Sequence, residues 1–218
     1  MKNELLNRIF TSLVLLPILF YAIINSGIYL IILLILVYSL SIYEIIKNTR
    51  NILFIFFSNI LLILSFYSFY SLRGDTEYSL IISCWILIAT FFSDIGGYVF
   101  GKIFKGKKIT KISPNKTYSG AIGSLIFSSL SLFLLNFLQV SFLNKLLVNF
   151  LELNFFVLTI LISFVCQIGD LFVSYWKRKI MIKNISNILP GHGGVLDRID
   201  GLIFVLIFCF VLNLFGLI

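Results

Sequence analysis

Charged residues are scarce in this chain of 218 residues, and their scarcity is the first guide to its class. Aspartate, glutamate, lysine and arginine together make up 12% of the sequence, whereas hydrophobic residues make up 60%. Ordinary soluble proteins carry about 25% charged residues, so the composition excludes a soluble domain. The apolar runs are continuous rather than alternating with polar residues, which disfavours a transmembrane β-barrel.

Ligands for soft metal ions are also scarce. The chain has one histidine and three cysteines, which are Cys84, Cys166 and Cys209. Each cysteine lies inside an apolar run and no CxxC pair occurs, so a thiolate zinc site is disfavoured. We interpret all three as small buried hydrophobic residues. No Gly-x4-Gly-Lys-Ser/Thr motif is present, which excludes a P-loop enzyme.

Long apolar runs fill most of the sequence, and seven of them approach or exceed the ~20 residues that cross a bilayer as a helix. The predicted fold is therefore an all-α polytopic transmembrane bundle of about seven spans. The first span follows Lys2 and Arg8 without a small-x-small cleavage site, so we expect a retained helix rather than a signal peptide. The expected spans are 9–24, 28–46, 52–72, 78–104, 118–138, 154–176 and 199–217.

Lysine and arginine are distributed unevenly over the loops between these spans. One side of the membrane receives fifteen of the 17 basic residues, and the other side receives only Arg73 and Lys145. Because basic loops stay in the cytoplasm, we expect the N-terminus on the cytoplasmic side. The net charge of +8 then suits anionic lipid head groups and nucleotide phosphates, and we expect no nucleic-acid partner.

The segment between the last two spans, residues 169–200, is crowded with groups that bind phosphate and metal ions. Asp170 interrupts an apolar run about 10 Å below the expected cytoplasmic edge, at 1.5 Å per helical residue. A carboxylate inside a membrane span is unfavourable and points to a function. Ser174, Lys177 and Arg178 follow at i+4, i+7 and i+8, which places them on the same helix face.

Two further carboxylates, Asp197 and Asp200, are three residues apart at the start of the last span and share a helix face. They could instead be a plain N-cap and a first-turn charge favoured by the helix dipole. Arg198, between them, can bind a phosphate through two hydrogen bonds. Because hard oxygen ligands suit Mg²⁺, we predict a magnesium site made by Asp170, Asp197 and Asp200, and leave a second cation open.

A glycine-rich turn, Gly191-His192-Gly193-Gly194, lies between the cations and the aspartate pair. Such a turn can present backbone N–H groups to an anion in front of a helix. His192 is either a structural residue of the turn or a hydrogen-bond donor to substrate or pyrophosphate. With metal and cations beside it, the turn predicts phosphoryl or nucleotidyl transfer. The predicted catalytic residues are Asp170, Lys177, Arg178, Lys183, His192, Asp197 and Arg198.

The spacing of these residues carries a resemblance to a known family. The positions run Ser174-Tyr-Trp-Lys177-Arg178, then Lys183, then Pro190-Gly191-His192-Gly193-Gly194-x-x-Asp197-Arg198-x-Asp200. This pattern resembles the signature of the phosphatidate cytidylyltransferase (CDP-diacylglycerol synthase) family. This chain departs from it at Asn184, where the family usually has Asp, and at Trp176, where the family has an aliphatic residue or Phe.

A second block agrees, so that the resemblance covers residues 92–201. Ser93-Asp94-Ile-Gly-Gly97-Tyr98-Val-Phe-Gly101 resembles the family's Asp-Thr-Gly-Ala-Tyr-x-x-Gly run. Residues 112–120 resemble its Ser-Pro-Lys-Lys-Thr-Trp-Glu-Gly run, with Asn115 and Ser119 replacing a lysine and the glutamate. The predicted substrate-binding residues are Asp94, Ser113, Lys116, Ser174, Gly191, Gly193 and Gly194.

The resemblance implies transfer of a cytidylyl group from CTP to phosphatidate, giving CDP-diacylglycerol and pyrophosphate, with Mg²⁺ as cofactor. It implies a multi-pass protein of the inner (plasma) membrane, whose active site on the cytoplasmic face takes phosphatidate from the inner leaflet. A homodimer is left open. Residues 1–77 are expected to be N-terminal membrane helices and 78–218 the catalytic membrane domain of one integral unit. The alternatives are a CTP-dependent lipid kinase, a cytidylyltransferase for another lipid phosphate, and a transporter.

Overall fold

The chain folds into a bundle of long α-helices. The computed structural model describes residues 2–110, 113, 116–143, 148–179, 182, 185, 186, 188 and 193–218. These residues form α1 (Lys2–Asn25), α2 (Gly27–Asn48), α3 (Ile52–Arg73), α4 (Glu77–Phe104), α5 (Tyr118–Leu143), α6 (Leu153–Lys179) and α7 (Leu196–Leu214). Across the described residues no strand occurs, and one isolated antiparallel bridge joins Lys108 to Thr117. The predicted all-α fold is confirmed.

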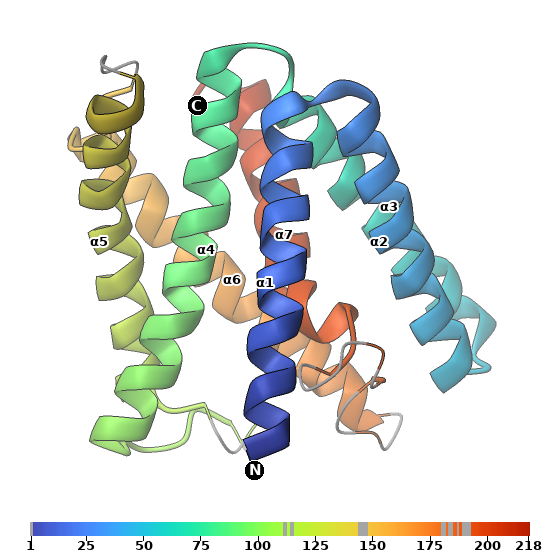
Figure 1. Cartoon of the computed structure of the whole chain (residues 1–218). Helices are drawn as coiled ribbons and strands as arrows, with labels where there is room; N and C mark the ends of the chain where they lie inside the picture. The colour runs from blue at the N-terminus through green and yellow to red at the C-terminus, as the bar shows by residue number, and fades with distance from the viewer. Residues whose placement is uncertain are drawn as a thin grey trace.

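Successive helices run in alternating directions, as Figure 1 shows. The N-terminus and the α2–α3, α4–α5 and α6–α7 connections lie at the lower end of the bundle in that view, and the other three connections lie at the upper end. The lower end therefore carries the loops in which the sequence concentrates lysine and arginine. We call it the basic end.

Five helices are long and apolar enough to cross a membrane, judged over the residues that the structure describes. These are α2, α3, α4, α6 and the Tyr118–Gln139 part of α5. Large apolar side chains cover the outside of the bundle, including Phe57, Phe91 and Phe137, each more than half exposed. Such a surface suits lipid rather than water. The α7 helix is not among the five, and its first five residues include Asp197, Arg198 and Asp200.

Polar side chains begin and end the helices where the apolar runs stop. Asn51 caps α3 by accepting a hydrogen bond from the Phe54 N–H at 3.2 Å. Thr76 and Ser79 form a capping box at the start of α4. Each cap satisfies N–H groups that have no partner within the helix. By contrast, Val195 at the start of α7 makes no side-chain cap hydrogen bond.

Close helix contacts depend on glycine and on buried polar pairs. Gly96 of α4 and Gly123 of α5 face each other so closely that a Cβ on either would collide with its neighbours. At the centre of the bundle Trp85 is fully buried, and its Nε1–H donates to Thr159 Oγ1 at 3.0 Å. The α3 helix packs against α7, so part of segment 1–77 supports the helix that carries the last two predicted carboxylates.

Arg73 stabilises the opposite end of the bundle, away from the basic loops. Its side chain is 3% exposed and donates hydrogen bonds to the carbonyl oxygens of Ile23 at 2.5 Å and Ile24 at 2.9 Å. These carbonyls belong to the last turn of α1, whose final C=O groups have no partner within the helix. Arg73 therefore ends α1 and ties it to α3.

Candidate active site

Two carboxylates from different helices meet near the basic end. Asp94 of α4 and Asp170 of α6 offer oxygen atoms that lie, together with Cys166 Sγ, within 4.8 Å of one another. The Cys166 thiol donates to Asp94 Oδ1 at 3.6 Å. Sequence analysis predicted both carboxylates separately, one for substrate and one for metal. The structure brings them into one cluster, although 76 positions separate them in the chain.

Asp200 of α7 joins this cluster because α6 and α7 approach closely. A Cβ on Gly201 would lie 2.6 Å from both Asp170 Oδ1 and Cys166 Sγ, so only glycine fits there. Asp200 interacts electrostatically with both Asp170 and Asp94. Three helices thus deliver three carboxylates to one region. We refer to Asp94, Asp170 and Asp200 as the carboxylate cluster.

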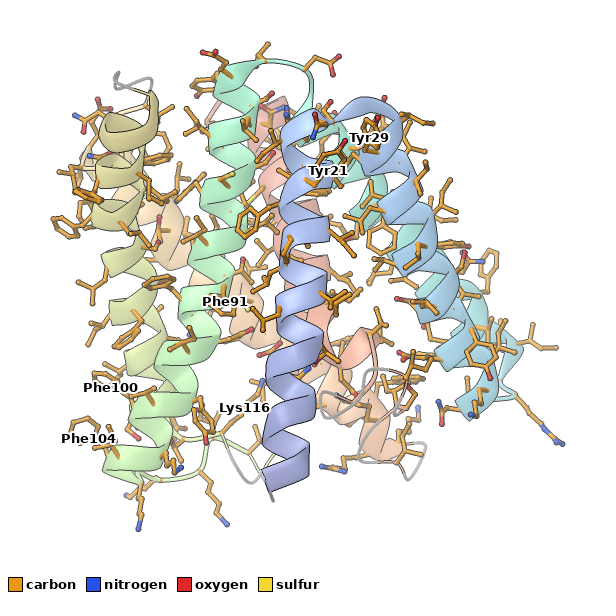
Figure 2. All side chains as sticks on the ribbon, viewed as in Figure 1. Tyr21, Tyr29, Phe91, Phe100, Phe104 and Lys116 are labelled. Carbon is orange, nitrogen blue, oxygen red and sulfur yellow. The ribbon has the colours of Figure 1, made fainter. Side chains whose placement is uncertain are left out.

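A lysine from the α4–α5 connection approaches the same cluster. Lys116 Nζ lies 3.3 Å from Asp170 Oδ2. A small backbone hairpin fixes its position, because the Ile109 N–H donates to the Lys116 carbonyl and the Tyr118 N–H donates to the Lys107 carbonyl. Figure 2 shows Lys116 near the lower end of the bundle, below Phe91 of α4. The predicted phosphate contact is therefore placed beside the predicted metal ligand.

Lys177 links the remaining two predicted metal ligands. Its Nζ lies 2.9 Å from Asp197 Oδ1 and 3.6 Å from Asp200 Oδ2, with the lysine side chain 11% exposed. The other oxygen of Asp197 accepts hydrogen bonds from the backbone N–H groups of Ile185 and Gly194, at 3.1 and 3.2 Å. Asp197 thus contacts a lysine and the loop before α7, and it reaches the carboxylate cluster through Lys177.

The other predicted residues surround this core unevenly. Arg198 is exposed and interacts electrostatically with Asp94. Arg178 is also exposed, and its Nη1 donates to the Ile182 carbonyl at 3.1 Å. Ser174 and Ser113 are half-buried, Gly193 has a positive φ of 91°, and Gly194 is buried. Lys183, Gly191 and His192 lie outside the described residues.

A cavity of about 170 Å³ opens beside the carboxylate cluster, between α4, α5 and α6. Asp94, Lys116, Asp170, Tyr98 and Gln167 are among the residues that line it. One ligand in this cavity could therefore contact charged side chains as well as the Tyr98 ring and the Gln167 amide. A molecule with an anionic head and an apolar body would match that lining.

One contact at this end was missed by sequence analysis. Glu44 of α2 has no exposed surface, and its carboxylate accepts hydrogen bonds from Ser186 Oγ and from the Val195 and Leu196 N–H groups. A carboxylate inside an apolar run is the signal that singled out Asp170, and it was equally present at Glu44. The resemblance on which site residues were chosen begins only at residue 92.

The donor set of the carboxylate cluster fits a hard divalent cation. Like charges this close repel unless a proton or a cation lies between them. Carboxylate oxygens are the ligands that Mg²⁺ takes in proteins, whereas the single thiol beside them is a soft ligand. A divalent cation among Asp94, Asp170 and Asp200 would remove the repulsion and would still face the cavity.

Comparison of the sequence with known proteins shows the family to which the chain belongs. Residues 48–215 match the model of the cytidylyltransferase family. The chain belongs to that family. Curated relatives named phosphatidate cytidylyltransferase include one from Rickettsia bellii, 39% identical over 121 residues, which are 55% of this chain and 52% of the relative.

Two further relatives carry the same name. The one from Rickettsia conorii is 35% identical over 123 residues, or 56% of this chain and 53% of the relative. The one from Helicobacter pylori is 34% identical over 137 residues, or 62% of this chain and 48% of the relative. The matched part of the chain thus spans about half the length of the curated relatives.

Proposed function

We propose that this protein transfers the cytidylyl group of CTP to phosphatidate, producing CDP-diacylglycerol and pyrophosphate. Membership of the cytidylyltransferase family and the names of its relatives support this reaction. The observation that carries the proposal is the carboxylate cluster, which lies beside Lys116 at the basic end of a bundle with membrane-spanning helices. A reaction that joins a nucleotide to a lipid phosphate requires a cation, a lysine that binds phosphate and apolar surroundings for the lipid.

The chemistry needs positioning and charge neutralisation more than proton transfer. A phosphate monoester has its second pKa near 6, so the phosphatidate oxygen is already a nucleophile at neutral pH. It attacks the α-phosphorus of CTP in line, the bond from that phosphorus to the bridging oxygen breaks, and pyrophosphate leaves with the bond's electron pair. No side chain has to remove a proton before the attack.

Each part of the site has a distinct role in this proposal. Asp94, Asp170 and Asp200 would hold Mg²⁺, and the bound ion would neutralise charge on the triphosphate. Lys116 contacts a phosphate from the α4–α5 side, and Arg198 contacts one from α7. Lys177 keeps Asp197 and Asp200 at fixed separations. Among the other predicted residues, Arg178 and Lys183 would neutralise charge on the substrate and transition state, and His192 and the glycine turn would bind the leaving pyrophosphate.

The membrane orientation follows from the charge distribution and belongs to the same proposal. Basic loops remain cytoplasmic, so the basic end faces the cytoplasm, where CTP is available. The protein then lies in the bacterial inner membrane, and its lipid substrate reaches the cavity from the inner leaflet. Such a site must accept one substrate from water and the other from lipid.

The test is a reconstitution with both products measured. Purified protein is supplied with phosphatidate, α-labelled CTP and Mg²⁺, and we expect CDP-lipid and pyrophosphate in equal amounts. Asp170→Asn should abolish most of the product, whereas Asp75→Asn, at the opposite end where Asp75 accepts from Ser26 Oγ at 2.9 Å, should not. Release of CDP without pyrophosphate would indicate a lipid kinase, and no CTP turnover would overturn the proposal.

A further inference from the structure

The buried carboxylate of Glu44 makes a contact that joins α2 to the start of α7. Its two oxygens accept hydrogen bonds from consecutive backbone N–H groups, Val195 at 2.8 Å and Leu196 at 2.9 Å. Ser186 Oγ donates to the same carboxylate. Gly194 permits this approach, because a Cβ there would lie 3.0 Å from both Glu44 oxygens.

The start of α7 depends on this contact, because it has no side-chain cap of its own. Val195 occupies the N-cap position without any side-chain hydrogen bond. The first N–H groups of a helix have no partner within it, and the helix dipole favours an anion there. Glu44 supplies both the acceptor atoms and the negative charge from a different helix.

A second contact from the same end of α2 strengthens the link. Asn48 Nδ2 donates to the Ile185 carbonyl at 2.7 Å, while the Ile185 N–H donates to Asp197 Oδ2. The last turn of α2 therefore holds the chain before α7 at two points. The segment before α7 also contacts the start of α7, through the hydrogen bond from Ile185 to Asp197.

The first five residues of α7 are the part of the helix that carries site residues. Asp197, Arg198 and Asp200 all follow Leu196 within four positions. A change in where α7 begins would move Asp200 relative to Asp170, and Gly201 leaves little free space for such a shift. Lys177 bridges two residues of this segment and would lose its geometry as well.

We propose that Glu44 is a positioning residue, which caps α7 from α2 and thereby fixes Asp200 against Asp170 for binding of the cation. The inference rests on the proposed function, since it assigns Glu44 a role in that reaction. Glu44 is fully buried, is occupied by backbone amides and is not among the residues that line the cavity. It acts through α7 and does not touch substrate.

The experiment compares Glu44→Gln with two matched controls. Gln has nearly the same volume but no charge, and its NH₂ group cannot accept from Val195 or Leu196. Ser41→Ala removes a buried hydroxyl of the same helix, which donates to the Val37 carbonyl at 2.8 Å and makes no hydrogen bond with α7 in the described residues. Arg73→Met destabilises the bundle at the opposite end.

Two readouts decide the outcome. We expect Glu44→Gln to raise the Mg²⁺ concentration for half-maximal CDP-lipid formation by about tenfold or more, as losses of supporting contacts at metal sites do. Amide hydrogen exchange should accelerate in peptides covering 193–201 and stay unchanged in α4 and α5. Arg73→Met should lower the thermal midpoint without changing the Mg²⁺ requirement, and Ser41→Ala should change neither.

The proposal is overturned if Glu44→Gln leaves exchange at 193–201 unchanged, or if its Mg²⁺ requirement rises only as much as that of Arg73→Met. An inactive wild-type protein would instead refute the proposed function. In that case amide hydrogen exchange at 193–201 and the affinity for Mn²⁺, each compared between Glu44→Gln and the wild type, would still test whether Glu44 positions α7. If Glu44→Gln does not fold, Glu44→Asp tests the same contact, because its shorter side chain cannot reach both amides.

Discussion

Replacing Lys177 with methionine should destabilise the protein, because it leaves two carboxylates, only 13% and 18% exposed, without their shared cation. Two unit charges about 4 Å apart attract by about 4 kcal/mol at the effective dielectric constant of a protein interior. Lys177 Nζ lies 2.9 Å from Asp197 and 3.6 Å from Asp200. Desolvation offsets much of this attraction in the intact network. Removing one partner of a buried pair, however, costs about 3–5 kcal/mol.

The loss should appear in thermal unfolding. For a chain of this size about 3 kcal/mol lowers the midpoint by roughly 6–12 °C. Tryptophan fluorescence can follow it, since Trp176 precedes Lys177 and stacks on Phe54 with ring centroids 3.7 Å apart. Lys102→Met is the matched control, because Lys102 is exposed and contacts the Tyr98 ring. We expect that control to unfold like the wild type.

A double variant sharpens the test of the Lys177 contact. Adding Asp197→Asn to Lys177→Met removes one of the unpaired charges and should recover part of the lost stability. The interaction energy from the cycle should be about 1–3 kcal/mol. A Lys177→Met protein that unfolds at the wild-type temperature, or a cycle with no interaction energy, would refute the buried charge network.

Three other predictions concern packing and ligand chemistry. Arg73→Met should lower stability by about 2–4 kcal/mol, measured by chemical unfolding in detergent, because three hydrogen bonds from a charged group are lost. Gly201→Ala should reduce CDP-lipid formation by about tenfold or more, measured as initial rate, because its Cβ would collide with Asp170; an unchanged rate would contradict the close approach of α6 and α7. Cys166→Ser should keep turnover with Mg²⁺ but weaken inhibition by Cd²⁺, a soft cation; equal inhibition of both proteins would show that the thiol does not face the cation.

The helices were predictable from the sequence because each depends on local information. A continuous apolar run long enough to cross a bilayer folds as a helix whatever its neighbours are, since its backbone must satisfy its own hydrogen bonds in lipid. The expected span 52–72 and the observed helix Ile52–Arg73 differ by one residue. The start of α1 was less accurate, because the helix extends to Lys2, well before the apolar run.

The arrangement of the site was only partly predictable. Asp170 was found because a carboxylate inside an apolar run is unfavourable without a role, but its meeting with Asp94 depends on how α4 and α6 pack. Asp197 and Asp200 share a helix face as the three-residue spacing predicts, yet Lys177 and two backbone amides contact Asp197. Metal binding by Asp197 stays a prediction. Glu44 carried the same signal as Asp170 but lies before residue 92, where the resemblance begins, and its partners, 142 to 152 positions away, could not be predicted from the sequence.

Binding of Mn²⁺ in the absence of substrate, measured by electron paramagnetic resonance, tests the carboxylate cluster most directly. We expect the wild-type protein to bind Mn²⁺, and Asp94→Asn, Asp170→Asn and Asp200→Asn each to weaken that binding strongly. Asp75→Asn, at the opposite end of the bundle, should bind Mn²⁺ as the wild type does. If Asp94→Asn and Asp170→Asn also bind it with wild-type affinity, the three carboxylates do not hold the cation.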